Sequence, residues 1–306
     1  MAVFLTTLNQ MAVLFTFILI GFLLKKKQIL PPDSAGVLSK LETHIIMPAL
    51  ILNTFITKCT VDIIKSKAPV VLWGVALALI SVIAAIPLAV PFAKKGPLRK
   101  IYCYSIAVAN SGFMGNAVMI GVFGNDIFFD YLIFTMPINM IIYTWGVSQL
   151  IPDGNGKNPL LRLINPVCMS MVIGAAIGLL GVRLPAFAST VLSSAAACMA
   201  PLAMILTGFT IGGYSLKALL TDKKIYAVTA LRLVILPVFF VFLFRLCGMP
   251  HDILILALCT VAMPLGLNTV VFPASYGMDT STGAGMALIS HTLSVITIPL
   301  CFALLL

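Results

Sequence analysis

Charged residues are scarce in this sequence. They make up 9% of its 306 residues, whereas 61% are hydrophobic. Nine are acidic, and Glu42 is the one glutamate among them. Soluble domains carry about 25% charged residues, so this composition excludes an ordinary soluble domain and indicates an integral membrane protein whose solvent is lipid.

Sequence patterns of catalysis and metal binding are also missing. There is no HExxH, GxSxG or Walker motif, and every acidic residue except Glu42 lies in a predicted loop or at a span end. The seven cysteines are odd in number, scattered and without a CxxC pair, which argues against a disulfide framework or a zinc site. We therefore expect no enzymatic activity, no cofactor and no metal.

Ten stretches of the chain are long and apolar enough to cross a bilayer. A helix needs about 20 apolar residues to span a hydrocarbon core of roughly 30 Å. The predicted spans are residues 4–24, 37–57, 69–92, 101–123, 128–151, 160–181, 186–213, 225–247, 252–275 and 280–304. Because the links are short, the sequence predicts an all-α, multi-pass protein of ten transmembrane helices.

Lysine and arginine are unevenly divided between the two sides of this bundle. The side reached after the odd-numbered spans carries Lys25, Lys26, Lys27, Lys40, Lys94, Lys95, Arg99, Lys100, Lys157, Arg162, Lys217, Lys223 and Lys224. The opposite side carries only Lys58, Lys65, Lys67, Arg183 and Arg245. Basic residues are enriched in cytoplasmic loops, so we predict a protein of the cytoplasmic membrane with both termini outside. The net charge of +10 then reports topology, and we expect no nucleic-acid partner.

The two halves of the chain share a pattern. A shift of 153 residues aligns Pro32 with Pro185, Pro48 with Pro201, Pro97 with Pro250, Gly21 with Gly174, Gly124 with Gly277, and Asp126 with Asp279. With nine prolines in each half, chance predicts about half a proline match, against the three found. Five helices per half force the second half to insert upside down. Residues 1–153 and 154–306 are thus predicted to be inverted repeats, the geometry that alternating access requires.

Two matched spans contain helix breakers at mid-membrane, where lipid tolerates them only beside protein or a water-filled cavity. These residues are Asn110, Ser111, Gly112, Gly115 and Asn116 in the fourth span, and Pro264, Gly266, Asn268 and Thr269 in the ninth. The 153-residue shift places Ser111 opposite Pro264. If both helices unwind and cross there, two half-helix N-termini converge on a midplane cavity suited to a carboxylate. The alternative is that the glycines serve close packing and Pro264 is a simple kink.

Arg232, His291 and Glu42 are ionisable residues that lie inside predicted spans, away from the span ends. Arg232, roughly 10 Å deep in the eighth span, either reaches back to the cytoplasmic interface or faces an anionic substrate. His291 in the tenth span is a candidate proton carrier, with a neutral, hydrogen-bonded core histidine as the alternative. Glu42 follows Ser39 by three positions, which favours a capping box at the start of the second span.

These motifs resemble the auxin efflux carrier family, which includes plant auxin exporters and bacterial permeases for malate, malonate and similar acids. The resembling segments, spread over nearly the whole chain, are Met47 to Leu50, Ala109 to Gly115 with Phe123 and Gly124, Pro264 to Asn268 with Tyr276 and Gly277, and Ser294 to Leu300. One departure is that residues 151–159 alone join the halves, where plant members have a long cytoplasmic loop. Regulation through that loop is therefore absent here.

The resemblance implies a fold similar to the bile-acid symporters, with spans 1, 2, 6 and 7 as a scaffold and spans 3–5 and 8–10 as an elevator-type moving unit. It also implies a homodimer joined through spans 2 and 7, and contact between Asn110 and the substrate carboxylate. We expect a secondary transporter for a small organic anion. Two alternatives stay open: a sodium-coupled symporter of bile-acid type, for which the crossing offers only neutral oxygen ligands, and a membrane sensor that binds an anion without moving it.

Overall fold

The computed structural model describes residues 2–60, 66–151, 164–215, 219–274 and 278–306, and within them the regular secondary structure is helical. Seven helices are long and apolar enough to cross a membrane: Val3–Lys26, Ser34–Lys58, Ala68–Leu88, Asn125–Leu150, Ala186–Gly212, Lys223–Leu246 and Ser281–Leu305. The other three predicted spans contain the shorter apolar helices Ser111–Phe123, Pro166–Leu179 and His251–Val261. The prediction of an all-α protein built from membrane-spanning helices is therefore confirmed.

Several spans are composed of more than one helical segment. The first half contains α1 (Ala2–Lys26), α2 (Ser34–Leu41), α3 (Met47–Lys58), α5 (Ala68–Leu88), α6 (Pro97–Ala107), α7 (Asn116–Phe123), α8 (Asn125–Ile141) and α9 (Val147–Leu150). The second contains α10 (Pro166–Leu179), α11 (Ala186–Ala197), α12 (Met199–Gly212), α14 (Lys223–Ala230), α15 (Leu236–Leu246), α16 (His251–Val261), α17 (Asn268–Ala274) and α18 (Ser281–Leu305). π-Helical turns are inserted at η1 (Glu42–Ile46), η2 (Ser111–Gly115), η3 (Ile142–Gly146) and η5 (Leu231–Ile235).

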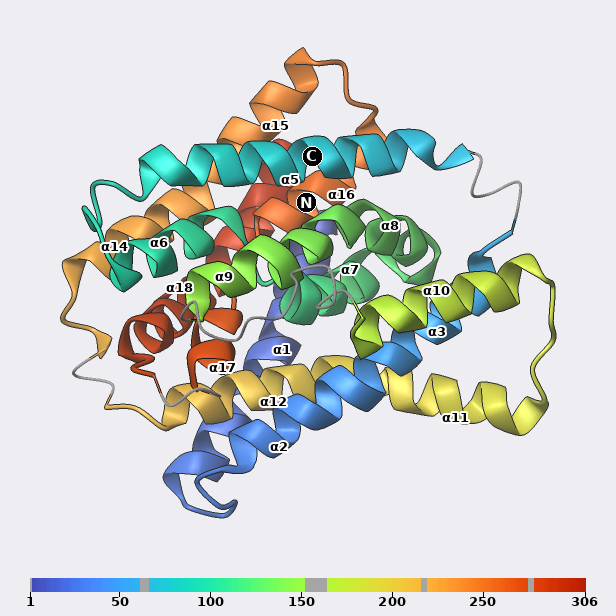
Figure 1. The fold of residues 1–306 in the computed structure, drawn as a ribbon, viewed down its shortest axis with the longest axis horizontal. Helices are drawn as coiled ribbons and strands as arrows, with labels where there is room; N and C mark the ends of the chain where they lie inside the picture. The colour runs from blue at the N-terminus through green and yellow to red at the C-terminus, as the bar shows by residue number, and fades with distance from the viewer. Residues whose placement is uncertain (1, 61–65, 152–163, 216–218, 275–277) are drawn as a thin grey trace.

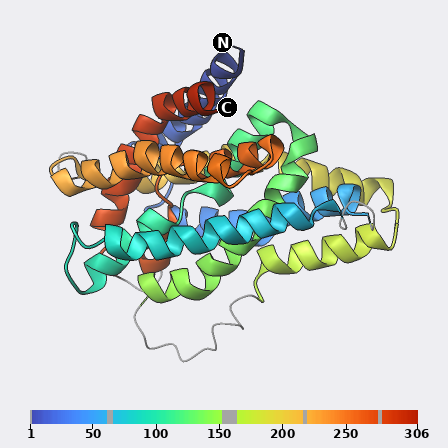
Figure 2. The same cartoon turned by 90° about the horizontal axis from the view of Figure 1, so that it is seen from above.

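The helices form two packed groups (Figure 1). In the first, α1 lies along α12, and α3 lies along α10 and α11. In the second, α5 packs on α8 and α6, α15 on α16, and α14 on α18. The groups meet where α1 contacts α7 and α18, and Figure 2 shows the molecule from a perpendicular direction.

Glycines bring the helices of the first group into backbone contact. A Cβ atom at Gly21 of α1 would overlap the carbonyl oxygen of Ile205 of α12. A Cβ atom at Gly174 of α10 would lie 2.8 Å from Cβ of Phe55 and 3.3 Å from the carbonyl oxygen of Leu52, both in α3. Small residues allow the backbones of two helices to approach this closely. In lipid, where there is no hydrophobic effect between helices, this close van der Waals packing is a main source of attraction.

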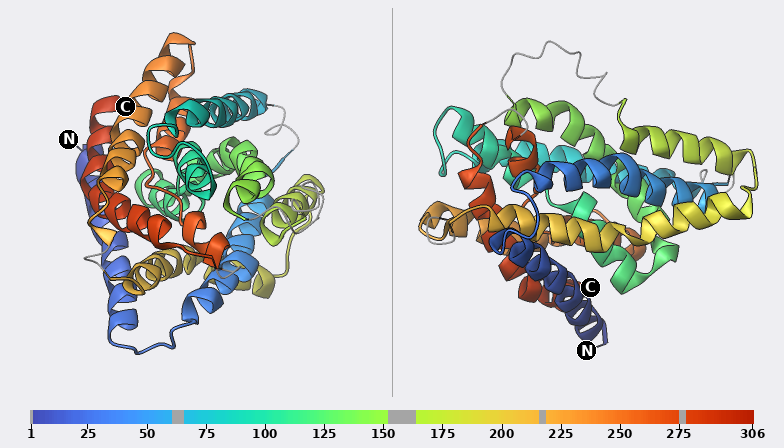
Figure 3. Two further views of the ribbon diagram at one scale, coloured as in Figure 1. Left: turned by 60° about the vertical axis from the view of Figure 1, so that its left-hand side comes forward. Right: turned by 90° about the horizontal axis from the view of Figure 1, so that it is seen from below.

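The two termini lie side by side in every view (Figure 3), because α1 packs against α18. An even number of crossings requires both ends on one side of a membrane. Some features used in the sequence arguments lie outside the described residues: Lys65, Lys157, Arg162, Lys217, Tyr276, Gly277 and residues 152–159 of the link between the halves.

Glu42 does not form the predicted capping box. The second span begins at Ser34, and Glu42 lies inside it, in the π-helical turn η1. Its side chain is fully buried, and neither carboxyl oxygen has a hydrogen-bond partner among the described residues. The Ser-x-x-Glu pattern was misleading because the helix already begins at Ser34, so Ser39 and Glu42 both lie inside it and neither is at its start.

Candidate functional site

The fourth and ninth spans break and cross at the predicted positions. Helix α6 ends at Ala107, and the following chain is extended at Val108. An isolated antiparallel bridge joins Ala109 to Leu265, and the backbone N–H of Asn110 donates to the Pro264 carbonyl oxygen at 2.8 Å. The backbone groups released by each break are thus satisfied partly by the other break, as a membrane interior demands.

Asn110 caps the half-helix that follows the first break. Its carbonyl oxygen accepts from the backbone N–H groups of Met114, at 3.2 Å, and Gly115, at 3.0 Å. The first N–H groups of a helix have no intrahelical partner and carry a partial positive charge. Here they belong to η2, which continues into α7. The half-helix Ser111–Phe123 therefore presents a positive end at the crossing.

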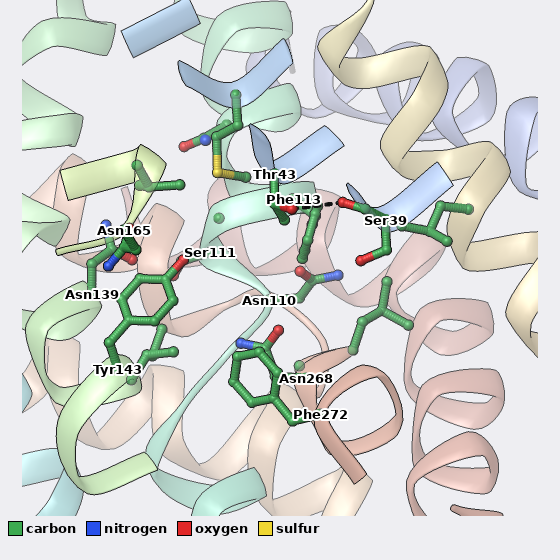
Figure 4. Close-up of a pocket in the computed structure, with 18 of the residues that line it drawn as sticks. Ser39, Thr43, Asn110, Ser111, Phe113, Asn139, Tyr143, Asn165, Asn268 and Phe272 are labelled. Atoms are coloured by element: carbon green, nitrogen blue, oxygen red, sulfur yellow. Dashed lines mark hydrogen bonds between the residues drawn. The ribbon is translucent and has the colours of Figure 1, made fainter. Parts of the chain in front are cut away.

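A cavity of about 600 Å³ extends from the crossing (Figure 4). Its polar lining consists mainly of amides and hydroxyls: Ser39, Thr43, Asn110, Ser111, Asn116, Thr135, Asn139, Tyr143, Asn165, Thr210 and Asn268. Charged and titratable lining residues, namely Asp33, Lys40 and His44, come from the start of the second span. Near the crossing the described lining is thus uncharged, and the half-helix end contributes a partial positive charge there.

The cavity extends toward one side of the bundle. Its lining includes Asp33 and Ala35 at the start of the second span, and Asn165 and Pro166 at the start of α10. These segments lie on the same side of the bundle as the link between α1 and α2, which begins with the lysines at positions 25–27. No lining residue comes from the described links at the opposite ends of the spans.

Six of the eleven predicted site residues line this cavity: Asn110, Ser111, Gly112, Asn116, Gly266 and Asn268. The Asn268 amide donates to the Tyr104 hydroxyl at 2.9 Å, which orients it at the wall. The Ser111 hydroxyl is buried and has no partner among the described residues. A buried hydroxyl without a partner costs free energy, so its position beside the cavity marks a place where a ligand oxygen would be stabilised.

The other five have different environments. Gly115 allows close packing, because a Cβ atom there would overlap the Tyr131 hydroxyl. The Pro264 carbonyl oxygen accepts from the backbone N–H of Asn110, and the Thr269 hydroxyl donates to the Gly266 carbonyl oxygen at 2.9 Å. Arg232 and His291 are buried next to the broken segment but do not line the cavity. The predicted residues therefore include some that line the cavity and some that serve close packing or hydrogen bonding inside the bundle.

Arg232 fits neither alternative that the sequence offered. It is 2% exposed, so it does not reach an interface, and its Nη1 donates to the Ile106 carbonyl oxygen at 3.1 Å. Ile106 lies in the last turn of the half-helix α6, where carbonyl groups lack intrahelical partners and carry partial negative charge. Arg232 thus holds the C-terminal end of the half-helix that precedes the break.

Sequence reasoning missed the cavity wall opposite the crossing. That wall includes Ser39 and Thr43 from the second span, Asn139 and Tyr143 from the fifth, and Asn165 before α10. Asn139 and Tyr143 are four residues apart in an apolar span, a spacing that places both on one helix face. Polar side chains at helical spacing were therefore the signal that could have located this wall.

A family model described as "Membrane transport protein" matches residues 6–159 and again residues 153–302. An uncharacterized transporter of Escherichia coli, YfdV, is 21% identical over 300 residues, which cover 92% of each chain. An uncharacterized transporter of Methanothermobacter thermautotrophicus is 24% identical over 300 residues, covering 92% of this chain and 93% of that protein. The resemblance inferred from the motifs is thereby confirmed: the chain belongs to the membrane transport protein family, the family of the auxin efflux carriers.

Proposed function

We propose that this protein is a secondary transporter that moves a small organic acid anion, a mono- or dicarboxylate, across the cytoplasmic membrane by alternating access. The observation that carries this proposal is the crossing of two broken helices beside a cavity of about 600 Å³. An anion there would meet the positive end of Ser111–Phe123, the orphaned Ser111 hydroxyl and the amides of Asn110 and Asn268. The volume suits a small organic molecule.

A two-repeat architecture supports the proposed alternating access. We take residues 1–153 and 154–306 as inverted five-helix repeats, which agrees with the double match of the family model. The glycine contacts support this relation: adding 153 turns Gly21 into Gly174 and Leu52 into Ile205, so the pair Gly21 and Ile205 has its counterpart in Gly174 and Leu52. Helices α1, α3, α10 and α12 would form the scaffold, and the other group would move as an elevator.

The orientation of the cavity supports an inward-open state of the carrier. The cavity extends toward the lysine-rich side, which the basic residue count assigns to the cytoplasm. The conformation would then be inward-open, with both termini outside. The second and seventh spans would join two copies into a homodimer, an assignment that suits α11, none of whose residues is buried within one chain.

The test is uptake of radiolabelled malate and malonate into proteoliposomes, with and without a sodium gradient. Saturable uptake that needs no sodium and is accelerated by unlabelled acid on the opposite side supports the proposal. Strict sodium dependence would identify a bile-acid-type symporter instead. Binding of the acids to the purified protein without uptake would identify a sensor, and would contradict the proposal.

A further inference from the structure

His291 makes its two ring contacts with different partners. Its Nδ1 lies 2.8 Å from the Ala287 carbonyl oxygen, and its Nε2 lies 3.0 Å from Nδ2 of Asn110. A carbonyl oxygen only accepts, so Nδ1 carries a hydrogen and donates. An amide nitrogen only donates, so Nε2 is the acceptor and the imidazole is neutral. In this arrangement the side-chain amide of Asn110 gives one N–H to His291, and its side-chain oxygen Oδ1 has no hydrogen bond from the described residues.

A second proton on His291 would reverse this contact. Both ring nitrogens of an imidazolium are donors, so Nε2 would require an acceptor. Asn110 can supply one only by turning its amide through half a revolution, which gives the Oδ1 atom to His291 and directs the NH₂ group toward the cavity. Asn110 lines the cavity between Phe113 and Asn268 (Figure 4), so the turn would replace an acceptor facing the substrate by donors.

We propose that protonation of His291 and binding of the carboxylate are coupled through the orientation of the Asn110 amide, so that the carrier moves its anion together with a proton. The inference rests on the proposed function and names its coupling ion. A carboxylate accepts hydrogen bonds and is repelled by a carbonyl oxygen. It therefore binds better when His291 is protonated, because the NH₂ group of Asn110 then faces the cavity and its Oδ1 atom does not. By linkage, the bound anion must increase the proton affinity of His291 to the same extent.

The surrounding charges favour arrival of the proton with the anion. His291 lies in α18, which packs against α1, α12, α14, η5, α15, α16 and α17, and the Ser105 hydroxyl of α6 donates to the sulfur of Met286 in α18. These neighbouring elements carry the following titratable residues: Lys25, Lys26, Arg99, Lys100, Tyr102, Cys103, Tyr104, Lys223, Lys224, Tyr226, Arg232, Arg245, His251, Asp252 and Cys259. Among them, Arg232 is both charged and buried, and its hydrogen bond to Ile106 places it on the same broken segment as Asn110. This positive charge opposes a second one on His291 until an anion balances it.

The experiment measures malate and malonate binding by calorimetry, from about pH 6.5 to about pH 8.5, where both carboxylates are largely ionised. Two buffers of different ionisation enthalpy give the number of protons taken up per anion. For the wild type we expect proton uptake and affinity that weakens with rising pH, up to tenfold per unit for one linked proton. His291→Gln, which can still bond to Asn110 but cannot be protonated, should bind without either effect. Monodispersity on size exclusion shows that each variant is folded.

Two controls remove other titratable groups. His251→Gln changes an exposed histidine at the start of α16, and Glu42→Gln changes the buried acid in η1; both should keep the wild-type pH dependence. Wild-type affinity that does not vary with pH, or a folded His291→Gln variant that retains the variation, would overturn the coupling while leaving the proposed function intact. Absence of any binding and uptake by the wild type would instead overturn the proposed function, and this inference with it.

Discussion

The guanidinium group of Arg232 donates to the carbonyl oxygen of Ile106 at 3.1 Å, one residue before the half-helix α6 ends. This bond joins η5 in the eighth span to the broken fourth span. A positive charge at the C-terminal end of a helix is stabilised by the carbonyl dipoles. Arg232, for which the sequence offered either an interfacial or a substrate-facing position, therefore contacts the framework of the site.

The first prediction follows from this contact. Arg232→Lys keeps a positive charge near the carbonyl end of α6, so transport should retain a KM close to wild type. Arg232→Met leaves the Ile106 carbonyl oxygen buried without that donor, and should lower the free energy of unfolding by about 1 to 3 kcal/mol. Uptake kinetics and unfolding in detergent measure the two effects. A large increase in KM for a well-folded Arg232→Lys variant would show that the guanidinium contacts the anion.

The second prediction concerns the amides at the crossing. Losing a hydrogen bond to a charged ligand costs about 1.5 to 3 kcal/mol, which is roughly a 10- to 150-fold loss of affinity. Asn110→Ala and Asn268→Ala should each weaken malate or malonate binding by such a factor, measured by calorimetry. Asn53→Ala, outside the cavity, is the matched control and should have much less effect. Wild-type affinity in both crossing variants would mean that the crossing is only a structural kink.

Asn268 needs one further control, because its amide also donates to the Tyr104 hydroxyl. Tyr104→Phe removes that acceptor and leaves the amide at the cavity wall. If Asn268 acts on the anion directly, Tyr104→Phe should weaken binding less than Asn268→Ala does.

The third prediction is that two glycines of the π-helical turn η2, Gly112 and Gly115, respond differently to replacement by alanine. A Cβ atom at Gly112 meets only the methyl carbon of Met47, at 3.9 Å, and would project beside the cavity, so Gly112→Ala should fold normally and weaken binding of the larger acids most. A Cβ atom at Gly115 would overlap the Tyr131 hydroxyl, so Gly115→Ala should cost about 1 to 3 kcal/mol of stability. Thermal unfolding and binding should be measured on both. The double variant Gly115→Ala with Tyr131→Phe should recover part of the stability; equal stability of the two single variants would contradict this assignment.

The fourth prediction concerns Glu42, which is buried with both carboxyl oxygens unpaired among the described residues. Each unsatisfied buried polar group costs about 1 to 3 kcal/mol, so Glu42→Leu should raise the free energy of unfolding by an amount in this range. Glu42→Gln, which keeps two polar groups at the same place, should gain less. Chemical unfolding in detergent gives both values. Strong destabilisation by the leucine would show that the carboxyl group has a binding partner in the membrane.

The fifth prediction tests orientation. Lys95 and Arg183 are both exposed and lie on the sides assigned to the cytoplasm and the exterior. In a cysteine-free background, a cysteine replacing Arg183 should react with an impermeant thiol reagent in intact cells, and one replacing Lys95 should react only after the cells are opened. The opposite pattern would reverse the topology and make the cavity outward-facing.

The sequence by itself determined that the chain is helical and membrane-spanning, and where the fourth and ninth predicted spans break. Lipid offers no hydrogen bonds, so each span must be long, apolar and helical, and a break such as Ser111 or Pro264 can occur only where protein or a cavity compensates for it. These constraints act on residues close together in the chain, and they can be read directly from composition and from the positions of glycine, proline and asparagine.

Only the tertiary structure decided which side chains meet. A membrane helix is apolar on the face toward lipid and on the face toward other helices, so hydrophobic periodicity does not reveal which face is buried. The sequence therefore did not distinguish Gly112, beside the cavity, from Gly115, packed on Tyr131. It also could not give Arg232 its partner Ile106, 126 residues away, or His291 its partner Asn110, 181 residues away. Such contacts depend on how separate spans are placed against one another, which no local pattern encodes.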